Sequence, residues 1–184
     1  MTKPLPSPQE LRNLLDYCPE TGVMQWKPRD LNLFPTSSAA RRWHTRWCGK
    51  PAMNTWDKAG YKVGSIAGVS MKAHRVAWAI HFGQWPKDDI DHMNGDKSDN
   101  RIRNLRPATR AENSRYSTSS YGSSRFKGVS RHRKTGKWRA TITVNRKQFH
   151  LGLFGTQELA AIRYNAAAVE FFGVFAKLNK GVGA

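Results

Sequence analysis

Cysteine is scarce in this chain of 184 residues. The two cysteines, Cys18 and Cys48, stand thirty positions apart, and neither belongs to a Cys-x-x-Cys pair. A zinc ribbon takes four ligands in closely spaced pairs, so the sequence excludes one. The sequence allows one disulfide between the two cysteines, while reduced thiols inside a cell are the simpler interpretation.

Long apolar runs are also missing. No stretch approaches the roughly 20 apolar residues of a membrane-spanning helix, and residues 1–8 lack the apolar core of a signal peptide. The chain can still bury a core, since 39% of its residues are hydrophobic and seven are tryptophan. Its length suits one ordinary domain or two small ones. We therefore expect an intracellular, cytoplasmic protein without a membrane segment.

Acidic residues number 13 against 31 lysines and arginines, which gives a net charge of +18. The imbalance is largest in residues 116–184, where 12 basic side chains face 2 acidic ones. A small basic chain of this kind typically binds a polyanion. Nucleic acid is the leading partner, and an anionic membrane is the competing one.

One stretch, residues 89–113, gathers side chains that serve hydrolytic chemistry. Asp91 and His92 are adjacent, Asn104 follows His92 by twelve positions, and Asn113 follows Asn104 by nine. An Asp-His pair alone is common at strand ends, and on its own it would have a structural explanation. The spacing of the two later asparagines, together with the turn and helix signals between them, favours a functional site.

Two local signals predict the structure of this stretch. Asn94-Gly95 favours a tight turn, because both residues accept positive φ. Thr109 and Glu112 match a capping box, which predicts a helix that carries Asn113 on its first turns. The expected unit is a strand end, a loop, a short strand and a helix. A calcium loop starting at Asp89 is excluded, because its sixth and twelfth positions hold Asn rather than Gly and Glu.

The spaced residues Asp91-His92, Asn104 and Asn113 resemble the metal motif of HNH (ββα-metal) endonucleases, in the phage-type subgroup whose last His is Asn. The resemblance extends upstream to residues 16–26 and 73–86 and covers about residues 9–116. It implies an α+β nuclease module over residues 1–116, of the kind found in phage or intron-encoded homing-type endonucleases, and a bacterial or phage-infected cell as its setting.

The resemblance and the chemistry of phosphodiester hydrolysis together give these residues roles. Asp91 and Asn113 would hold one divalent cation, and so sparse an oxygen site suits Mg²⁺, with Mn²⁺ as the other candidate. His92 would act as the general base that takes a proton from the attacking water. Asn104 would hydrogen-bond across the loop and hold His92 in place.

The segments upstream of this motif are less informative. Residues 9–17 and 71–82 have helical periodicity, and residues 60–69 predict a hairpin. We expect His74 to be a surface or packing residue that, beside Arg75, could reach a DNA phosphate. Residues 27–54 show no regular pattern. Within them the Arg- and Trp-rich run 41–47 could bind phosphates and stack on bases, or it could be a solvated loop whose tryptophans cover the core.

The second half of the chain follows a Ser-rich linker, residues 117–125. Strands are expected over 126–131, 137–144 and 148–154, with alternation that puts Ala140 and Ile142 on one face and Arg139 and Thr141 on the other. Thr156 predicts the start of a helix that runs to about residue 172. Three antiparallel strands packed on one helix are therefore expected over residues 126–180.

This second pattern resembles the ethylene-response-factor (APETALA-type) DNA-binding domain. The matching residues include Gly136-Lys137-Trp138, the run 151–156 and Leu178-Asn179. The resemblance implies that the sheet enters the major groove of DNA. Its expected DNA-contacting residues are Arg131, Arg133, Lys137 and Arg139. Ser130 replaces the arginine of the plant domains, and one residue is inserted before Gly136, so base preference does not transfer.

The sequence thus predicts a metal-dependent DNA endonuclease, acting as a monomer on double-stranded DNA, whose C-terminal domain targets it. The alternative is a DNA-binding regulator that keeps the nuclease scaffold without its activity, and RNA as the substrate is a weaker third option. The basic C-terminal sheet could also be only a solvated face.

Overall fold

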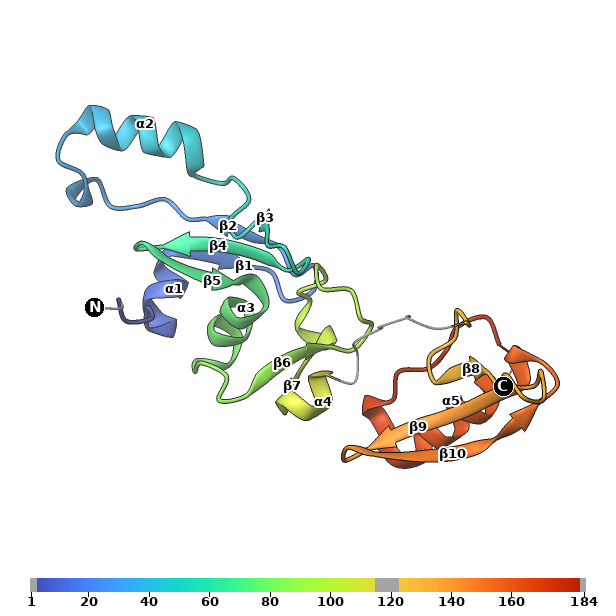
Figure 1. Ribbon diagram of the computed structural model, residues 1–184. Coiled ribbons are helices and arrows are strands. Elements are labelled where there is room, and N and C mark those ends of the chain that lie inside the picture. Colours follow the sequence, from blue (N-terminus) through green and yellow to red (C-terminus); the bar gives the residue numbers. More distant parts are fainter. Residues whose placement is uncertain (1–2, 115–122, 183–184) are drawn as a thin grey trace. The chain divides into compact units, whose positions relative to one another are not determined.

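The computed structural model describes residues 3–114 and 123–182, which fall into two compact units, Met1–Arg110 and Ala111–Ala184. Helices and several small antiparallel sheets make up both units (Figure 1), as expected for an α+β protein. Cys18 and Cys48 are free thiols. Within the described residues no helix is long and apolar enough to cross a membrane.

The first unit is built from short elements on one core. Its helices are α1 (Pro8–Leu14), α2 (Ser37–Trp47), α3 (Ala73–Phe82) and the start of α4 (Arg110–Ser114). Its strands form three small sheets: β1 (Leu15–Tyr17) with β2 (Met24–Trp26), β3 (Thr55–Trp56) with β4 (Lys62–Ile66) and β5 (Val69–Lys72), and β6 (Asp89–His92) with β7 (Leu105–Ala108). Two 3₁₀ turns, η1 (Leu31–Leu33) and η2 (Ile102–Asn104), complete it.

The core of the first unit lies between α1, α3 and the adjacent strands. Leu11, Leu15, Ile66 and Val76 are its largest fully buried side chains. The predicted helix over 9–17 is shorter than expected, because Leu15–Tyr17 leaves the helix to pair with β2. Gly83 ends α3 in a left-handed conformation, just after the last residue of the helical pattern over 71–82.

Helix α2 corrects the expectation of irregular chain over 27–54. Thr36 caps it by accepting a hydrogen bond from the Ala39 amide (3.1 Å). The eleven residues that follow contain no Pro or Gly, so nothing in them interrupts a helix once the cap has started it. The Arg- and Trp-rich run 41–47 is therefore helical rather than a loop.

The hairpin of β6 and β7 carries the central motif. Asp91 lies opposite Arg106 and His92 opposite Leu105 in its register. Helix α4 starts at Arg110, directly after the predicted cap residue Thr109. The order strand, loop, strand, helix is thus the order that the turn and capping signals predicted.

The second unit is a three-stranded sheet covered by one long helix. The strands β8 (Val129–Arg131), β9 (Trp138–Val144) and β10 (Lys147–Phe154) lie in the order β10-β9-β8, and α5 (Gln157–Phe172) precedes a 3₁₀ turn, η3 (Gly173–Phe175). Asn145 and Arg146 both have positive φ (48° and 66°), as a two-residue hairpin turn requires. This confirms the predicted sheet-and-helix fold.

Small residues allow the helix to lie close to this sheet. Ala160, Ala161, Ala167 and Ala168 are fully buried on α5, beside Tyr164. On β9 the buried residues are Ala140 and Ile142, whereas Arg139 and Thr143 are exposed. The predicted alternation of β9 is therefore observed, and it leaves a polar face of the sheet uncovered by α5.

The predicted linker ends earlier than residue 125. Its central part, residues 115–122, lies outside the described residues. Ser124 is buried, accepts a hydrogen bond from the Phe126 amide (3.1 Å) and donates one to Gln157 (3.1 Å). The Ser123 hydroxyl accepts a hydrogen bond from the Arg131 amide (2.7 Å). Residues 123–125 therefore form part of the second unit, because the Ser123 and Ser124 hydroxyls hydrogen-bond to its backbone and to Gln157 of α5.

Gly128 is expected to be the least replaceable glycine of the second unit. Its φ is +73°, and a Cβ there would lie 2.2 Å from the Tyr164 ring and 2.5 Å from the Thr141 carbonyl. We expect Gly128→Ala to lower the free energy of unfolding by about 2–4 kcal/mol, because strain and overpacking add. Urea denaturation followed by circular dichroism measures this. Gly155→Ala is the control, since a Cβ there meets nothing within 4 Å, and equal losses in both variants would contradict the packing described.

Candidate active site

Asp91 is buried, and its carboxylate is paired with an arginine of the adjacent strand. The Arg106 guanidinium donates two hydrogen bonds to Asp91 Oδ2, from Nε (2.8 Å) and Nη2 (2.7 Å). The register of the hairpin places the two residues directly opposite each other. Both of these bonds go to Oδ2, and neither engages Oδ1.

His92 follows Asp91 on β6 and is equally buried, with 4% of its surface exposed. Its Nε2 lies 3.2 Å from Asn100 Oδ1. With that oxygen as the acceptor, Nε2 carries the proton and Nδ1 keeps a lone pair. Burial lowers the pKa of His92 below its usual value, although Asn100 and Asp91 act in the opposite direction. A neutral imidazole of this kind can accept a proton near pH 7.

Asn104 ties the two sides of the loop together. Its Oδ1 accepts a hydrogen bond from the Asn94 amide (3.0 Å), and its Nδ2 donates one to the Asp99 carbonyl (2.8 Å). It makes these bonds across the loop that follows His92, whereas the side chain that contacts His92 is Asn100. Sequence reasoning missed Asn100, which lies in the Asp- and Asn-rich run that was examined only as a calcium loop.

The loop between β6 and η2 is rigidified by its own side chains. The Gly95 amide donates to the His92 carbonyl (2.8 Å), so the turn has Met93 and Asn94 at its centre and Gly95 at its end. Gly95 has positive φ (76°) and Asn94 does not, which corrects the expectation that both would. The Arg101 guanidinium lowers the pKa of Asp99 to about 2. The loop therefore presents a fixed carboxylate beside the site.

His74 lies under His92 rather than on the surface. Its ring is 4% exposed and stands edge-on to that of His92, with 5.0 Å between ring centroids, and Tyr61 packs on both rings. Of the two positions expected for His74, the packing one is therefore observed, and the buried side chain does not support the predicted phosphate contact. Its Nδ1 has no hydrogen-bond partner among the described residues. Burial, with nearby His92, Lys72 and Arg75, lowers the pKa of His74 to about 3.

Arg75 positions the strand that carries the site. Its Nη1 donates to the Asp88 carbonyl and its Nη2 to the Pro86 carbonyl, both at 3.0 Å. These bonds tie α3 to the segment that leads into β6. A DNA contact by Arg75 remains a prediction.

Asn113, the second proposed metal ligand, lies on α4 and is partly buried. The division between the units falls between Arg110 and Ala111, so Asn113 belongs to the second unit by its contacts. Its approach to Asp91 therefore remains a prediction. Across residues 3–114 and 123–182, no three His, Cys, Asp or Glu side chains gather into a metal site. A divalent cation held by Asp91 and Asn113 remains a prediction.

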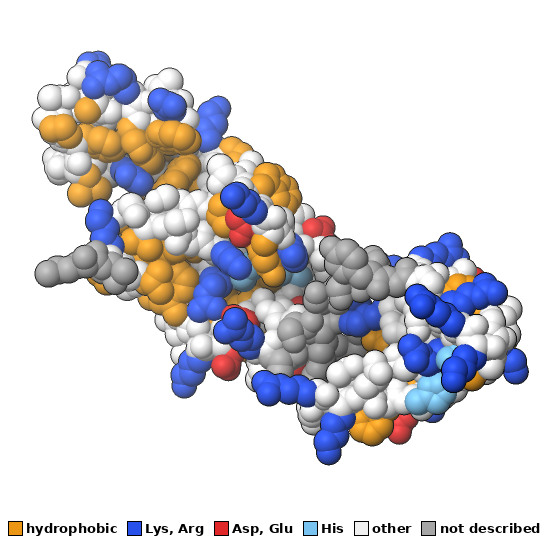
Figure 2. All heavy atoms as spheres, in the orientation of Figure 1, with side chains coloured by type: hydrophobic (Ala, Val, Ile, Leu, Met, Phe, Trp, Pro, Cys, Tyr) orange, Lys and Arg blue, Asp and Glu red, His pale blue; other side chains and the backbone are white. Residues whose placement is uncertain are grey.

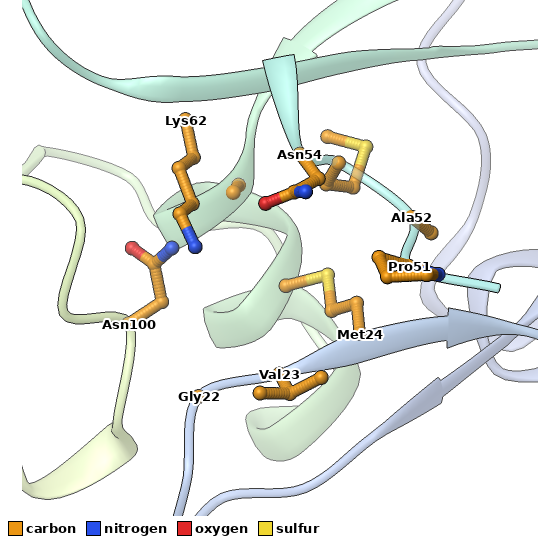
Figure 3. Close-up of a pocket in the computed structure, with 10 residues that line it drawn as sticks. Gly22, Val23, Met24, Pro51, Ala52, Asn54, Lys62 and Asn100 are labelled. Carbon is orange, nitrogen blue, oxygen red and sulfur yellow. The ribbon is translucent and has the colours of Figure 1, made fainter. Parts of the chain in front are cut away.

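A cavity of about 160 Å³ adjoins the partner of His92. Its walls are mostly apolar, and the side chains of Lys62, Asn54 and Asn100 come together at one side (Figure 3). Asn100 thus borders the cavity and also holds the His92 ring.

The exposed face of the second unit carries part of the predicted DNA-binding set. Arg139 lies opposite Ser130 in the register and donates to its hydroxyl (3.3 Å), and Arg133 and Lys137 are exposed in the turn between β8 and β9. Arg131 lies opposite Trp138, with its guanidinium 5.4 Å from the centre of that ring. Strand alternation therefore puts Arg131 on the helix side of the sheet, and its expected place beside Arg139 is corrected.

Comparison with known proteins matches two segments of this chain to two family models. Residues 71–115 match the family model of HNH endonucleases, and residues 124–173 match that of the AP2 domain. The AP2-like ethylene-responsive transcription factor ANT of Arabidopsis thaliana is 30% identical over 151 residues, which cover 73% of this chain and 27% of that protein. The AP2-like ethylene-responsive transcription factor At1g16060 of the same plant is 28% identical over 179 residues, 83% of this chain and 49% of that protein.

This chain therefore spans between about a quarter and a half of the length of these two relatives. Among solved structures, that of the HNH homing endonuclease I-HmuI aligns with 53% of this chain and 47% of its own, at 24% identity and a TM-score of 0.33. The two family matches confirm the resemblances that the sequence motifs indicated.

Acid is expected to destabilise the first unit through His74. Its folded pKa of about 3 lies below the ordinary value of 6.5, so between these values the unfolded chain binds a proton that the folded chain does not. The contribution is fully present above pH 6.5 and is lost as the pH falls toward 3. We expect His74→Phe to reduce the loss of unfolding free energy between pH 7 and pH 4 by on the order of 3 kcal/mol.

Chemical denaturation at a series of pH values measures this difference. His81→Phe is the control, because His81 is on the same helix but exposed. An unchanged pH dependence in His74→Phe would show that His74 titrates as it does in the unfolded chain. His92 retains part of the dependence in the variant, since its pKa shifts in the same direction.

Proposed function

We propose that this chain, in which an HNH segment precedes an AP2 domain, is a metal-dependent DNA endonuclease that hydrolyses phosphodiester bonds. The observation that carries the proposal is the pairing of Asp91 and His92 on one buried strand, each fixed by a separate partner. Such a pair offers a carboxylate oxygen and a neutral imidazole on consecutive residues at the end of one strand. The match of residues 71–115 to HNH endonucleases supports the same chemistry.

His92 is the general base of this proposal. Asn100 holds Nε2, so Nδ1 is the atom that takes the proton from the attacking water. Tyr61 and His74 pack against the ring and restrict its rotation. The lowered pKa keeps the ring unprotonated and ready to accept that proton at neutral pH.

Asp91 and Asn113 would hold one divalent cation, Mg²⁺ or Mn²⁺, which when bound neutralises charge on the phosphate and stabilises the departing 3′ oxygen. Arg106 orients the Asp91 carboxylate by holding Oδ2. Asn104 would position His92 indirectly, because its hydrogen bonds hold the loop that follows His92 in one conformation.

The AP2 domain is proposed to bind duplex DNA with the sheet face that α5 leaves uncovered. Arg139 stands on that face, and Arg133 and Lys137 extend it at the turn. Residues 116–184 carry 12 basic and 2 acidic side chains, which suits contact with phosphates. The relatives that share this domain are named as transcription factors. Their name supports DNA as the partner.

A DNA-binding regulator without nuclease activity is the second candidate function. Two observations favour it: the curated relatives named above are transcription factors rather than nucleases, and Asp91 already has a cationic partner in Arg106. In that case residues 89–113 would have only a structural role, and the sheet of β8, β9 and β10 would be the functional, DNA-binding surface.

Nicking of supercoiled plasmid separates these two functions. We expect cleavage in Mg²⁺ and none in EDTA, and we expect His92→Ala to lower the rate about 10²- to 10⁴-fold, because the general base is lost. His81→Ala is the matched control on an exposed histidine. Wild-type chain that binds DNA but does not nick it would favour the regulator. Cleavage that survives both EDTA and His92→Ala would come from a contaminating nuclease.

Arg139 tests the sheet as the DNA-binding face. We expect Arg139→Gln to weaken binding to a duplex and to lower the slope of log affinity against log salt by about 1, because one phosphate contact is lost. Arg139→Lys should restore the slope, since the charge is retained. Fluorescence anisotropy in EDTA, at several salt concentrations, measures both quantities. Wild-type affinity and slope in Arg139→Gln would show that this face does not contact DNA.

A further inference from the structure

Helix α2 contributes little to the folded core of the first unit. Of its eleven residues only Ala40 is buried, and it extends away from the sheet of β3, β4 and β5 (Figure 1). Yet it is well formed, with Thr36 as its cap. Buried Ala40 and partly buried Ala39, Trp43 and His44 account for one side of this helix, and the rest of its surface has no role in packing.

The inner side of α2 is fixed to the unit by aromatic contacts. The Arg29 guanidinium lies 4.2 Å from the centre of the Trp43 ring and 5.3 Å from that of Trp26. The Trp26 and Trp43 rings stand edge to face at 6.3 Å. The Arg29 amide donates to His44 Nε2 (3.2 Å). These contacts hold the helix in one orientation and leave its opposite side to solvent.

That opposite side is basic. Arg41, Arg42 and Arg46 are exposed, and Lys50 follows just after the helix. Residues 31–56 contain no Asp or Glu. In the part of the chain that the structure describes, none of the three arginines forms an ion pair. Figure 2 shows separate Lys and Arg side chains around the edge of this part of the molecule, beside a band of hydrophobic side chains.

The spacing of these arginines suits a DNA backbone. Arg42 and Arg46 are one helical turn apart, so their side chains lie on one face. From Arg41 to Arg46 the helix rises about 7.5 Å, over which one strand of B-DNA advances about two phosphates. Guanidinium groups bind phosphates with paired hydrogen bonds. The charge, its lack of acidic partners and its spacing all point to a polyanion.

We propose that the face of α2 formed by Arg41, Arg42 and Arg46 is an additional DNA-binding surface, which holds the duplex backbone without reading sequence. The proposal deepens the proposed function, since DNA is the substrate there. It gives the first unit its own hold on the duplex, independent of the AP2 sheet. The aromatic inner face serves to position the arginines and does not itself contact DNA.

An anionic membrane is the competing partner for a basic helix with tryptophans. The structure favours DNA, because Trp43 is packed against Trp26 and Arg29 and so is not free to enter lipid. Trp47 is 40% exposed, and the Arg46 guanidinium lies 5.1 Å from its ring. Leu31 and Leu33 of η1 add further exposed apolar surface (64% and 70% exposed), so vesicle binding is measured beside DNA binding.

The test uses the full chain carrying Arg41→Gln, Arg42→Gln and Arg46→Gln together. In EDTA, where no cleavage occurs, we expect weaker binding to a 30-base-pair duplex and a salt slope lower by about 3, at 0.9 per phosphate contact. The matched control replaces the same arginines with lysine, which should keep the slope near that of the wild type. Circular dichroism melting confirms that both variants are folded. A wild-type slope in the glutamine variant would overturn the proposal.

Two further measurements distinguish this proposal from membrane binding and from the proposed nuclease activity. Anionic and neutral phosphatidylcholine-based vesicles are offered to the wild type and to the glutamine variant. Charge-dependent vesicle binding that the variant loses, with an unchanged DNA slope, would overturn the proposal in favour of a membrane. Plasmid nicking in Mg²⁺ should show the same maximal rate at saturating DNA, with a higher half-saturation concentration. A further outcome is that the wild type does not nick plasmid at all, while the glutamine variant still has a lower slope of log affinity against log salt than the wild type. That outcome would refute the nuclease and support this surface.

Discussion

The ion pair between Asp91 and Arg106 is the constraint on which the candidate site depends. It joins the two strands of the β6–β7 hairpin at a buried position, with the side chains 4% and 14% exposed. Breaking a buried pair leaves an uncompensated charge and typically costs about 3–5 kcal/mol. The pair therefore fixes the register of the hairpin, and the register in turn places His92 above His74 and within reach of Asn100.

Each half of the candidate site is held by residues outside the spaced motif. Arg75 ties α3 to the segment before β6, Asn100 fixes one imidazole nitrogen, and Asn104 closes the loop between them. This arrangement separates residues that would meet substrate from residues that position them. It also places His74, with an unpartnered buried nitrogen, next to the proposed base.

The two units divide the work of DNA recognition in the proposed function. The second presents a polar strand face backed by a helix of small residues, and the first presents the site and the basic side of α2. Non-specific phosphate contacts raise affinity and on-rate without choosing a sequence, while a sheet in a groove can choose one. Tethering the two on one chain raises the concentration of each near the DNA that the other holds.

Local patterns in the sequence determined much of this molecule. These patterns include the alternation along β9, the Asn145-Arg146 turn, the end of α3 at Gly83 and the order of strand, loop, strand and helix around Asp91. All of them depend on neighbours a few residues apart. Helix α2 was missed because prolines around it obscured a pattern that starts at a Thr36 cap. The tertiary structure alone decided which side chains meet. Asn100 rather than Asn104 contacts His92, and Arg106 pairs with Asp91. His74 packs against His92, and Arg131 lies on the helix side of the sheet. Those outcomes depend on strand register and on packing between segments far apart in the chain, and no local pattern contains that information.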